Sequence, residues 1–121
     1  MHVYCGVDIV NVPRFKESVS NHGNPDLSNA FINRIFNKEE IEHIIGRENP
    51  YPGLAGRFAA KEAVIKAASH VKKISELKSI SVIGNIPKVN ISDPEFKDVQ
   101  FAVSISHDGD YAIAMVTAQI I

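Results

Sequence analysis

Hydrophobic and polar residues alternate along the first ten positions, and the period then lengthens. The alternation over residues 3–10 predicts a strand, because successive side chains of a strand point to opposite faces. Asn11 and Pro13 follow, a pair that suits the start of a helix. We therefore expect a short helix that buries Phe15 and Val19.

Helical spacing continues through the middle of the chain. Apolar residues recur at this spacing over residues 31–36, and Asn37 with Glu40 resembles a capping box that opens the next helix. A proline-containing loop at residues 48–53 leads into the central segment. From Arg57 to Lys73 neither Gly nor Pro interrupts a run of strong helix formers, which predicts a long helix.

The last third of the chain changes to strands rich in Val, Ile, Phe and Tyr. We expect strands over residues 79–83, 88–91, 101–107 and 111–120. Asp108-Gly109 favours a type I′ hairpin turn between the last two, since that turn needs positive φ at both central positions. Ser106 and His107 would then stand at the tip of a hairpin.

Composition narrows the class of protein. A length of 121 residues predicts one domain, spanning 1–121. The net charge of −1 gives no reason to expect nucleic acid or an anionic membrane as a partner. The single cysteine, Cys5, excludes an internal disulfide and fits a reducing compartment. No signal peptide and no stretch of membrane-spanning length is discernible.

The central helix sets three cations and one carboxylate into a run of small apolar residues. Residues four apart lie on neighbouring turns, so Arg57 sits over Lys61 and Glu62 over Lys66. Such a group can hold a polyphosphate while the acid holds its metal ion. Glu before Lys at this spacing is also the favoured orientation of an ordinary surface ion pair, and this helix alone favours that simpler interpretation.

Two other polar positions are candidates for chemistry. Asp8 lies inside a Val/Ile-rich strand, where a carboxylate is costly unless it is paired or bound to a metal. Backbone amides or an Arg could satisfy it, or it could bind Mg²⁺ together with water and phosphate oxygens. Ser106 and His107, taken alone, are ordinary polar residues at a strand end. No Cys/His spacing suggests zinc, and no glycine-rich phosphate loop is present.

These motifs occur in a familiar order, and the chain resembles holo-acyl-carrier-protein synthase, the short-chain branch of the phosphopantetheinyl transferase superfamily. The resemblance covers nearly the whole chain. It rests on Gly6-Val7-Asp8-Ile9-Val10, Arg14, Phe31 with Arg34 and Phe36, Arg57-Phe58-Ala59-Ala60-Lys61-Glu62-Ala63, and Ser104-Ile105-Ser106-His107.

The resemblance implies an enzyme that moves phosphopantetheine from coenzyme A to a serine of an apo acyl carrier protein. The reaction releases adenosine 3′,5′-bisphosphate and serves fatty acid or polyketide synthesis. The implied fold is α/β (α+β), with an N-terminal strand and helices followed by a small antiparallel sheet around a long central helix. The implied assembly is a homotrimer with active sites at the subunit boundaries, in the cytoplasm.

The resemblance also implies roles for matched residues. Asp8 and Glu62 would bind Mg²⁺, each reaching the site from an adjacent subunit, and Lys66 would neutralise charge near the transferring phosphorus. Arg14 would hold the acidic helix of the carrier protein. The attacking serine needs a proton acceptor, and a metal-bound water or a nearby carboxylate could serve. The positions expected to bind coenzyme A are Arg57, Lys61, Lys66, Ser106 and His107.

The chain departs from the family pattern in two loops. Residues 69–74 replace a short glycine-containing loop after the central helix, and Gly84-Asn85-Ile86-Pro87 replaces an Asn-Gly-Lys-Pro style turn. Lys72 and Lys73 either compensate electrostatically or form the basic end of the helix, and the helix dipole favours the second interpretation.

The sequence is also compatible with two other functions. One is a non-catalytic, oligomeric module of the same fold that binds coenzyme A or a carrier protein, and it is motivated by the altered loop after the central helix. Retention of both Asp8 and Glu62 argues against it, because a binding module has little use for two ligands of a hard metal ion. The other is a structural α/β protein with Asp8 in a buried ion pair.

Overall fold

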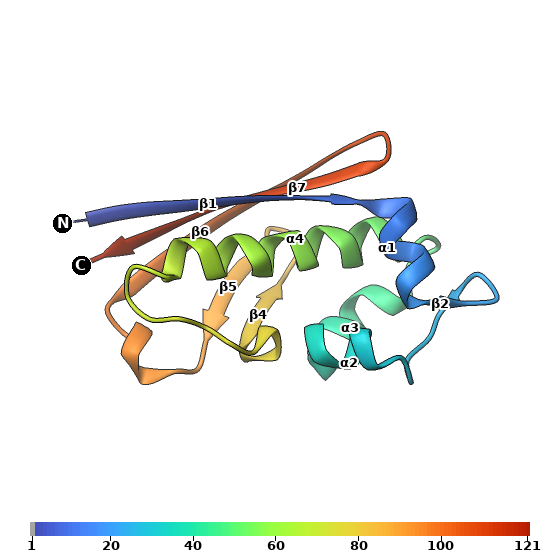
Figure 1. The fold of residues 1–121 in the computed structure, drawn as a ribbon, viewed down its shortest axis with the longest axis horizontal. Coiled ribbons are helices and arrows are strands. Elements are labelled where there is room, and N and C mark those ends of the chain that lie inside the picture. The colour runs from blue at the N-terminus through green and yellow to red at the C-terminus, as the bar shows by residue number, and fades with distance from the viewer. Residues whose placement is uncertain (1) are drawn as a thin grey trace.

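A long helix packed against one face of a three-stranded sheet forms the centre of the computed structural model, which describes residues 2–121 (Figure 1). The strands are antiparallel in the order β1 (His2–Asn11), β7 (Tyr111–Ile120), β6 (Val99–Asp108). Helix α4 (Tyr51–Ala68) crosses the face of this sheet and contacts all three strands. The predicted α/β (α+β) fold, with a small antiparallel sheet around a long central helix, is confirmed.

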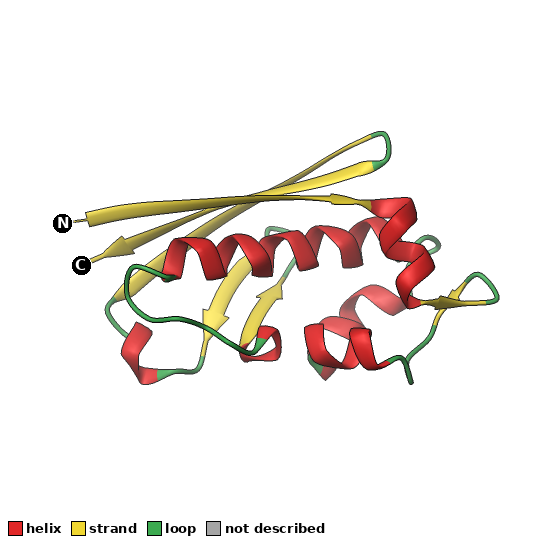
Figure 2. Ribbon diagram, viewed as in Figure 1, coloured by secondary structure: helices red, strands yellow, loops and turns green. Residues whose placement is uncertain are grey.

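The remaining elements lie on the side of α4 away from the sheet or at its ends (Figure 2). Those before α4 are α1 (Val12–Val19), β2 (Ser20–Asn21), β3 (Asn24–Pro25), α2 (Ala30–Ile35) and α3 (Lys38–Ile45). Those after it are the 3-10 turns η1 (Leu77–Ser79) and η2 (Pro94–Phe96) and the hairpin β4 (Ile80–Ile83) and β5 (Lys88–Ile91). No helix within residues 2–121 is both long and apolar enough to span a bilayer.

An asparagine begins each of the three short helices. The side chain of Asn11 accepts a hydrogen bond from the backbone of Arg14 at 2.9 Å, and Asn29 caps α2 in the same way. At α3 the side chain of Asn37 accepts from the backbone of Glu40, whose carboxylate accepts from the backbone of Asn37. The predicted capping box is therefore confirmed, and each cap satisfies backbone donors that a helix start leaves unpaired.

The hairpin between β6 and β7 is present, but its turn lies one residue later than predicted. Asp108 pairs with Tyr111, so Gly109 and Asp110 form the two-residue loop. Gly109 has φ +55°, whereas Asp110 is not in the positive-φ region. A positive φ at the first position alone is typical of a type II′ turn, for which glycine at that position is the usual choice. The type I′ turn at Asp108-Gly109 is therefore wrong.

Helix α4 begins and ends earlier than predicted. It includes the second half of the expected loop at residues 48–53, because Pro52 in the first turn removes only an N–H that has no helical partner there. It ends at Ala68, so Lys72 is not part of a basic helix end. The ammonium of Lys72 instead lies 2.6 Å from Asp93 and 3.3 Å from Glu95, which attaches the loop after α4 to η2.

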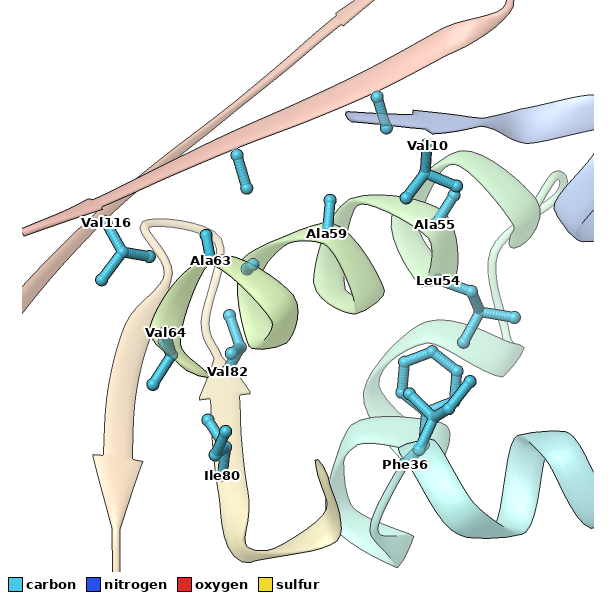
Figure 3. Close-up of a cluster of buried hydrophobic side chains, with 14 of the residues drawn as sticks. Val10, Phe36, Leu54, Ala55, Ala59, Ala63, Val64, Ile80, Val82 and Val116 are labelled. Carbon is cyan, nitrogen blue, oxygen red and sulfur yellow. The ribbon is translucent and has the colours of Figure 1, made fainter. Parts of the chain in front are cut away.

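Small residues line the contact between α4 and the sheet. Ala55, Ala59 and Ala63 point toward the strands, while larger side chains such as Leu54 and Phe36 fill the other side (Figure 3). The close approach continues at Gly6, where a Cβ atom would lie 2.2 Å from the carbonyl oxygen of Ala63. Only glycine fits this contact. It lets β1 pack closely on α4, and so it sets the distance between the side chains next to Gly6 and the helix.

Candidate active site

Two carboxylates and a lysine meet where β1 crosses α4. The ammonium of Lys66 donates a hydrogen bond to the carbonyl of Val7 at 2.8 Å and lies 3.4 Å from the carboxylate of Asp8. Glu62 is one helical turn before Lys66 and is half-buried. We call Asp8, Glu62 and Lys66 the carboxylate site. Both the strand and the helix hold their side chains on rigid backbone.

The electrostatics show that the two carboxylates are neighbours within a single chain. Burial raises the pKa of Glu62, the charge of Asp8 raises it further, and Lys66 opposes both effects. A single chain thus brings Asp8 next to the helical turn that carries Glu62 and Lys66, which differs from the expectation that adjacent subunits supply one carboxylate each. The reason is the contact at Gly6, which brings β1 close enough to α4 for Asp8 to reach the turn of Glu62 and Lys66.

The ion pair of Asp8 is open to solvent. The side chain of Asp8 is 24% exposed and that of Lys66 is 55% exposed. Exposed pairs of this kind add little to stability. A purely structural role as a buried ion pair does not fit this exposure, so the carboxylate site is available to a ligand.

The donors of the carboxylate site suit Mg²⁺. This ion commonly takes one or two protein carboxylates and completes its shell with water and phosphate oxygens. Across residues 2–121 no group of three or more His, Cys, Asp and Glu side chains converges, so zinc-type sites are not found in the described part of the chain. Two carboxylates open to solvent can bind a metal ion whose remaining coordination positions are filled by oxygens of a phosphorylated substrate.

Lys61 does not belong to this site. Its side chain is fully buried, and its ammonium donates to the carboxylate of Glu40 at 2.5 Å and to the carbonyls of Ile35 and Leu77 at 2.6 and 3.2 Å. These bonds use all three donors of a lysine. The prediction that Lys61 faces the phosphates of coenzyme A is therefore wrong, because the side chain points from α4 into the core beneath it.

A polar pocket of about 270 Å³ lies beside the first turns of α4. We call it the arginine pocket; its polar lining consists of Arg47, Asn49, Arg57, Asn85 and His107. Arg57 is only 5% exposed, and its guanidinium donates to the carbonyls of Gly53 at 3.4 Å and Gly84 at 3.2 Å. Its Nε has no partner within residues 2–121. An unpaired buried donor of this kind is costly to the folded state.

Two like charges face each other in the arginine pocket. Burial lowers the pKa of Arg57, and the nearby guanidinium of Arg47 lowers it further. Arginine stays protonated in proteins, so the pocket concentrates positive charge and favours an anion. Sequence reasoning missed Arg47, because it lies in a loop after α3 and no periodic spacing relates it to α4.

The two polar residues at the tip of β6 face opposite ways. The Nε2 atom of His107 lies 2.9 Å from the carbonyl oxygen of Pro52 at the start of α4, so this ring lines the arginine pocket. Ser106 pairs in register with Ile113 and lies on the other face of the sheet. One chain therefore brings His107 but not Ser106 to the pocket, as the two-residue period of a strand requires.

Arg14 lies on the exposed side of α1. Phe15, its neighbour, stacks on Phe58 of α4 with ring centroids 5.6 Å apart, which fixes α1 against the central helix. Arg14 is exposed, and within residues 2–121 its side chain makes no hydrogen bond or ion pair. Its guanidinium is thus available to an acidic partner.

The sheet face that points away from α4 is apolar and uncovered. Residues paired in register on this face include Val7 with Met115 and Ile9 with Ile113, all between 41% and 59% exposed. We call this surface the open sheet face; its exposed apolar side chains are Val3, Val7, Ile9, Tyr111, Ile113 and Met115. Apolar patches of this kind usually mark an interaction surface.

The carboxylate site and the arginine pocket lie at opposite edges of the sheet. Asp8 belongs to β1 and His107 to β6, which are the two edge strands of the order β1-β7-β6. Helix α4 runs between them, with Gly56 beneath β6 and Ala63 beneath β1. A single chain therefore holds these two polar groups at opposite edges of the sheet.

Comparison with known proteins gives a consistent family. A family model described as the 4'-phosphopantetheinyl transferase superfamily matches residues 4–116. A curated relative, the holo-[acyl-carrier-protein] synthase of Thermodesulfovibrio yellowstonii, is 43% identical over 114 residues, covering 92% of this chain and 93% of that protein. The enzyme of the same name from Chlamydia felis is 34% identical over 121 residues, covering 95% of each chain.

Solved structures agree in fold. An ACPS-CoA complex of Chronobacterium ammoniagenes has a TM-score of 0.78 and 28% identity, covering 100% of this chain and 99% of that one. The holo-[acyl-carrier-protein] synthase of Helicobacter pylori in complex with coenzyme A also has a TM-score of 0.78, with 27% identity over 95% of this chain and 99% of that one. The chain therefore belongs to the 4'-phosphopantetheinyl transferase superfamily, as a member of its holo-[acyl-carrier-protein] synthase family.

Proposed function

We propose that this enzyme transfers phosphopantetheine from coenzyme A to a serine of an apo acyl carrier protein at the carboxylate site, with Mg²⁺ bound by Asp8 and Glu62. The released product is adenosine 3′,5′-bisphosphate. The observation that carries the proposal is the meeting of two solvent-facing carboxylates with Lys66 on rigid backbone. Mass analysis of a carrier protein incubated with the enzyme, coenzyme A and Mg²⁺ tests it.

Phosphoryl transfer depends mainly on positioning and on charge neutralisation. When bound, Mg²⁺ supplies positive charge to the diphosphate of coenzyme A. Lys66 supplies a second positive charge, and its hydrogen bond to the carbonyl of Val7 holds the ammonium beside Asp8. The attacking serine also needs a proton acceptor, and a carboxylate near the site is our candidate for it.

The arginine pocket is proposed to hold the phosphorylated, nucleotide end of coenzyme A. Arg57 and Arg47 supply the positive charge. His107 lines the same hollow. The proposed coenzyme-binding residues of this pocket are therefore Arg57, His107 and Arg47, whereas Lys61 lies in the core.

We further propose a homotrimer in which the open sheet face is covered by the neighbouring copies. Three copies of one interface close a ring without leaving the apolar face of any copy exposed. In such a ring the carboxylate site of one subunit meets the arginine pocket of the next, which joins the two half-sites. Ser106 lies on the open sheet face, so it can reach coenzyme A only across a subunit boundary.

Mixing inactive variants tests this shared site. Asp8→Ala removes one half-site and His107→Ala damages the other, so mixed rings contain some boundaries with both halves intact. At each boundary one subunit supplies the carboxylate site and its neighbour supplies the arginine pocket. In a random equal mixture each of these is intact with a chance of one half, so about a quarter of the boundaries have both intact. We expect about that share of wild-type transfer at a coenzyme concentration where neither variant alone is active. Rates are measured after dissociation and reassembly of the mixture.

The matched control is a mixture of Asp8→Ala with Glu62→Ala. Both carboxylates come from the same chain, so no boundary in this mixture has an intact carboxylate site and activity should not return. Recovery of activity in this control, or a monomer by light scattering at micromolar concentration, would contradict the proposed arrangement.

Arg14 is proposed to attract the acidic carrier protein. An exposed charge at the rim of an interface steers encounter more than it stabilises the final complex. Arg14→Glu should therefore raise the KM for the carrier severalfold and leave the KM for coenzyme A nearly unchanged. Added salt should narrow the difference between variant and wild type, because screening removes the long-range attraction. Identical carrier KM values across a range of ionic strength would show that Arg14 is an ordinary surface residue.

We also propose a cytoplasmic location and a single phosphopantetheinyl transferase domain over residues 1–121. Cys5 is a free, exposed thiol, which suits a reducing compartment. Coenzyme A and acyl carrier protein are the proposed partners, and the near-neutral net charge of −1 gives nucleic acid no general attraction to the chain.

A further inference from the structure

Two glycines occupy the first turns of α4, where helix propensity argues against them. Gly53 and Gly56 are both buried within the helix. Glycine in a helix interior is destabilising relative to alanine, because it loses more conformational freedom on folding. Their φ angles are not in the positive region, so backbone geometry does not require glycine at either position. The reason for them must lie in what surrounds the helix.

The space that their side chains would fill is taken by residues of the arginine pocket. A Cβ atom at Gly56 would lie 3.2 Å from Nε2 and 3.4 Å from Cε1 of His107, and 2.9 Å from Cγ2 of Ile105. A Cβ atom at Gly53 would lie 3.0 Å from Nη1 of Arg47 and 3.1 Å from Cδ1 of Ile44. Each glycine therefore makes room for one polar side chain of the pocket.

The same stretch of helix also anchors the pocket through its backbone. The carbonyl of Pro52 lies 2.9 Å from Nε2 of His107, and the carbonyl of Gly53 accepts a hydrogen bond from Arg57. With no side chains in the way, the ring of His107 can lie directly on the helix backbone. An added methyl group at Gly56 would push the ring away and lengthen its contact with Pro52.

We propose that Gly53 and Gly56 are positioning residues for coenzyme binding: they form a floor without side chains that holds Arg47 and His107 in place for a phosphate group. The inference rests on the proposed function of the arginine pocket. It assigns these glycines a role in ligand affinity rather than in stability. The expected ligand is the phosphorylated nucleotide end of the substrate, represented by adenosine 3′,5′-bisphosphate.

Alanine variants separate affinity from stability. Gly56→Ala should raise the KM for coenzyme A about tenfold, keep kcat within about twofold and leave the carrier KM unchanged. Calorimetric binding of adenosine 3′,5′-bisphosphate to the enzyme without carrier should weaken by a similar factor. The Tm should not fall, because the gain in helix propensity offsets the displaced contacts. Gly53→Ala should act in the same direction through Arg47.

Gly46→Ala is the matched control. Gly46 ends α3, has φ −79°, and has no heavy atom within 4 Å of where its Cβ would lie. The same chemical change there should leave both the coenzyme KM and the binding of adenosine 3′,5′-bisphosphate unaltered. Any loss in Gly56→Ala then arises from the pocket and not from the loss of a glycine as such.

A double-mutant cycle provides the sharpest test. In a His107→Ala background the ring that Gly56→Ala displaces is absent, so the second substitution should have little further effect on coenzyme affinity. A full additional loss in that background would overturn the proposal. The proposal would also be overturned if Gly56→Ala lost stability or failed to fold while Gly46→Ala folded normally, and Gly53→Ala kept normal affinity for coenzyme A.

The cycle also distinguishes this inference from the function on which it rests. If His107→Ala and Arg47→Ala bind coenzyme A normally, the arginine pocket is not the coenzyme site and both proposals fall. If these two variants lose affinity but Gly53→Ala and Gly56→Ala do not, only the role of the glycine floor is overturned.

Discussion

Replacement of either Asp8 or Glu62 by alanine should abolish phosphopantetheine transfer and leave the enzyme folded. Loss of one carboxylate leaves the charge of the coenzyme diphosphate poorly balanced, so we expect a decrease in kcat/KM on the order of several hundredfold or more. Stability should change little, because Asp8 and Lys66 form a solvent-exposed pair. Initial rates on an apo carrier protein, together with circular dichroism, measure both effects.

Glu42→Ala is the control for these two variants. Glu42 forms an exposed i,i+4 pair with Lys38, at 3.9 Å, on helix α3, away from the site. This variant should retain wild-type transfer. Appreciable Mg²⁺-dependent turnover by both Asp8→Ala and Glu62→Ala would remove the carboxylate site from the reaction.

The second large effect concerns stability. Lys61→Ala should lower the free energy of unfolding by about 3–5 kcal/mol, because it leaves the carboxylate of Glu40 buried without its cation. Glu40 also accepts hydrogen bonds from the backbone of Val82 at 2.9 Å and of Asn37 at 3.0 Å, so its carboxylate cannot move out to water without breaking these contacts. Equilibrium denaturation in urea measures the loss.

Lys66→Ala is the matched lysine variant, five residues along the same helix. It should lose less than about 1 kcal/mol of stability, since its side chain is 55% exposed, but most of the activity. The two variants thus assign one lysine to the core and one to the chemistry. A Lys61→Ala variant as stable as the wild type, with impaired coenzyme binding, would return Lys61 to the coenzyme site.

The sequence predicted well those features that depend on local chemistry. The capping box of Asn37 and Glu40 needs only the residues of one turn, and the strands at both ends follow from residue type and alternation. The turn between β6 and β7 was displaced by one residue, because Asp108-Gly109 and Gly109-Asp110 are both acceptable turn sequences. Strand register, which is a tertiary property, decides between them.

The central helix shows why the candidate site was only partly predictable. Spacing places Arg57 over Lys61 and Glu62 over Lys66, but α4 is surrounded by other elements on most sides. A buried helix has no polar face to show which charged residues point outward. Lys61 turned inward to Glu40, whereas Lys66 turned to β1.

Contacts between distant residues could not be predicted from spacing at all. Asp8 and Glu62 lie close together within one chain because Gly6 packs against Ala63. Arg47 reaches the arginine pocket from a loop. Resemblance to a family pointed to the two carboxylates, but not to their meeting within one chain.

The central claim is that this chain, with Mg²⁺, moves phosphopantetheine from coenzyme A to the serine of an acyl carrier protein. Intact-mass analysis of an apo carrier after incubation with the enzyme, coenzyme A and Mg²⁺ tests it most directly. We predict a gain of one phosphopantetheine group, which disappears with a chelator and with a carrier whose acceptor serine is replaced by alanine. An unchanged carrier mass, with folded enzyme that binds coenzyme A, would contradict the claim.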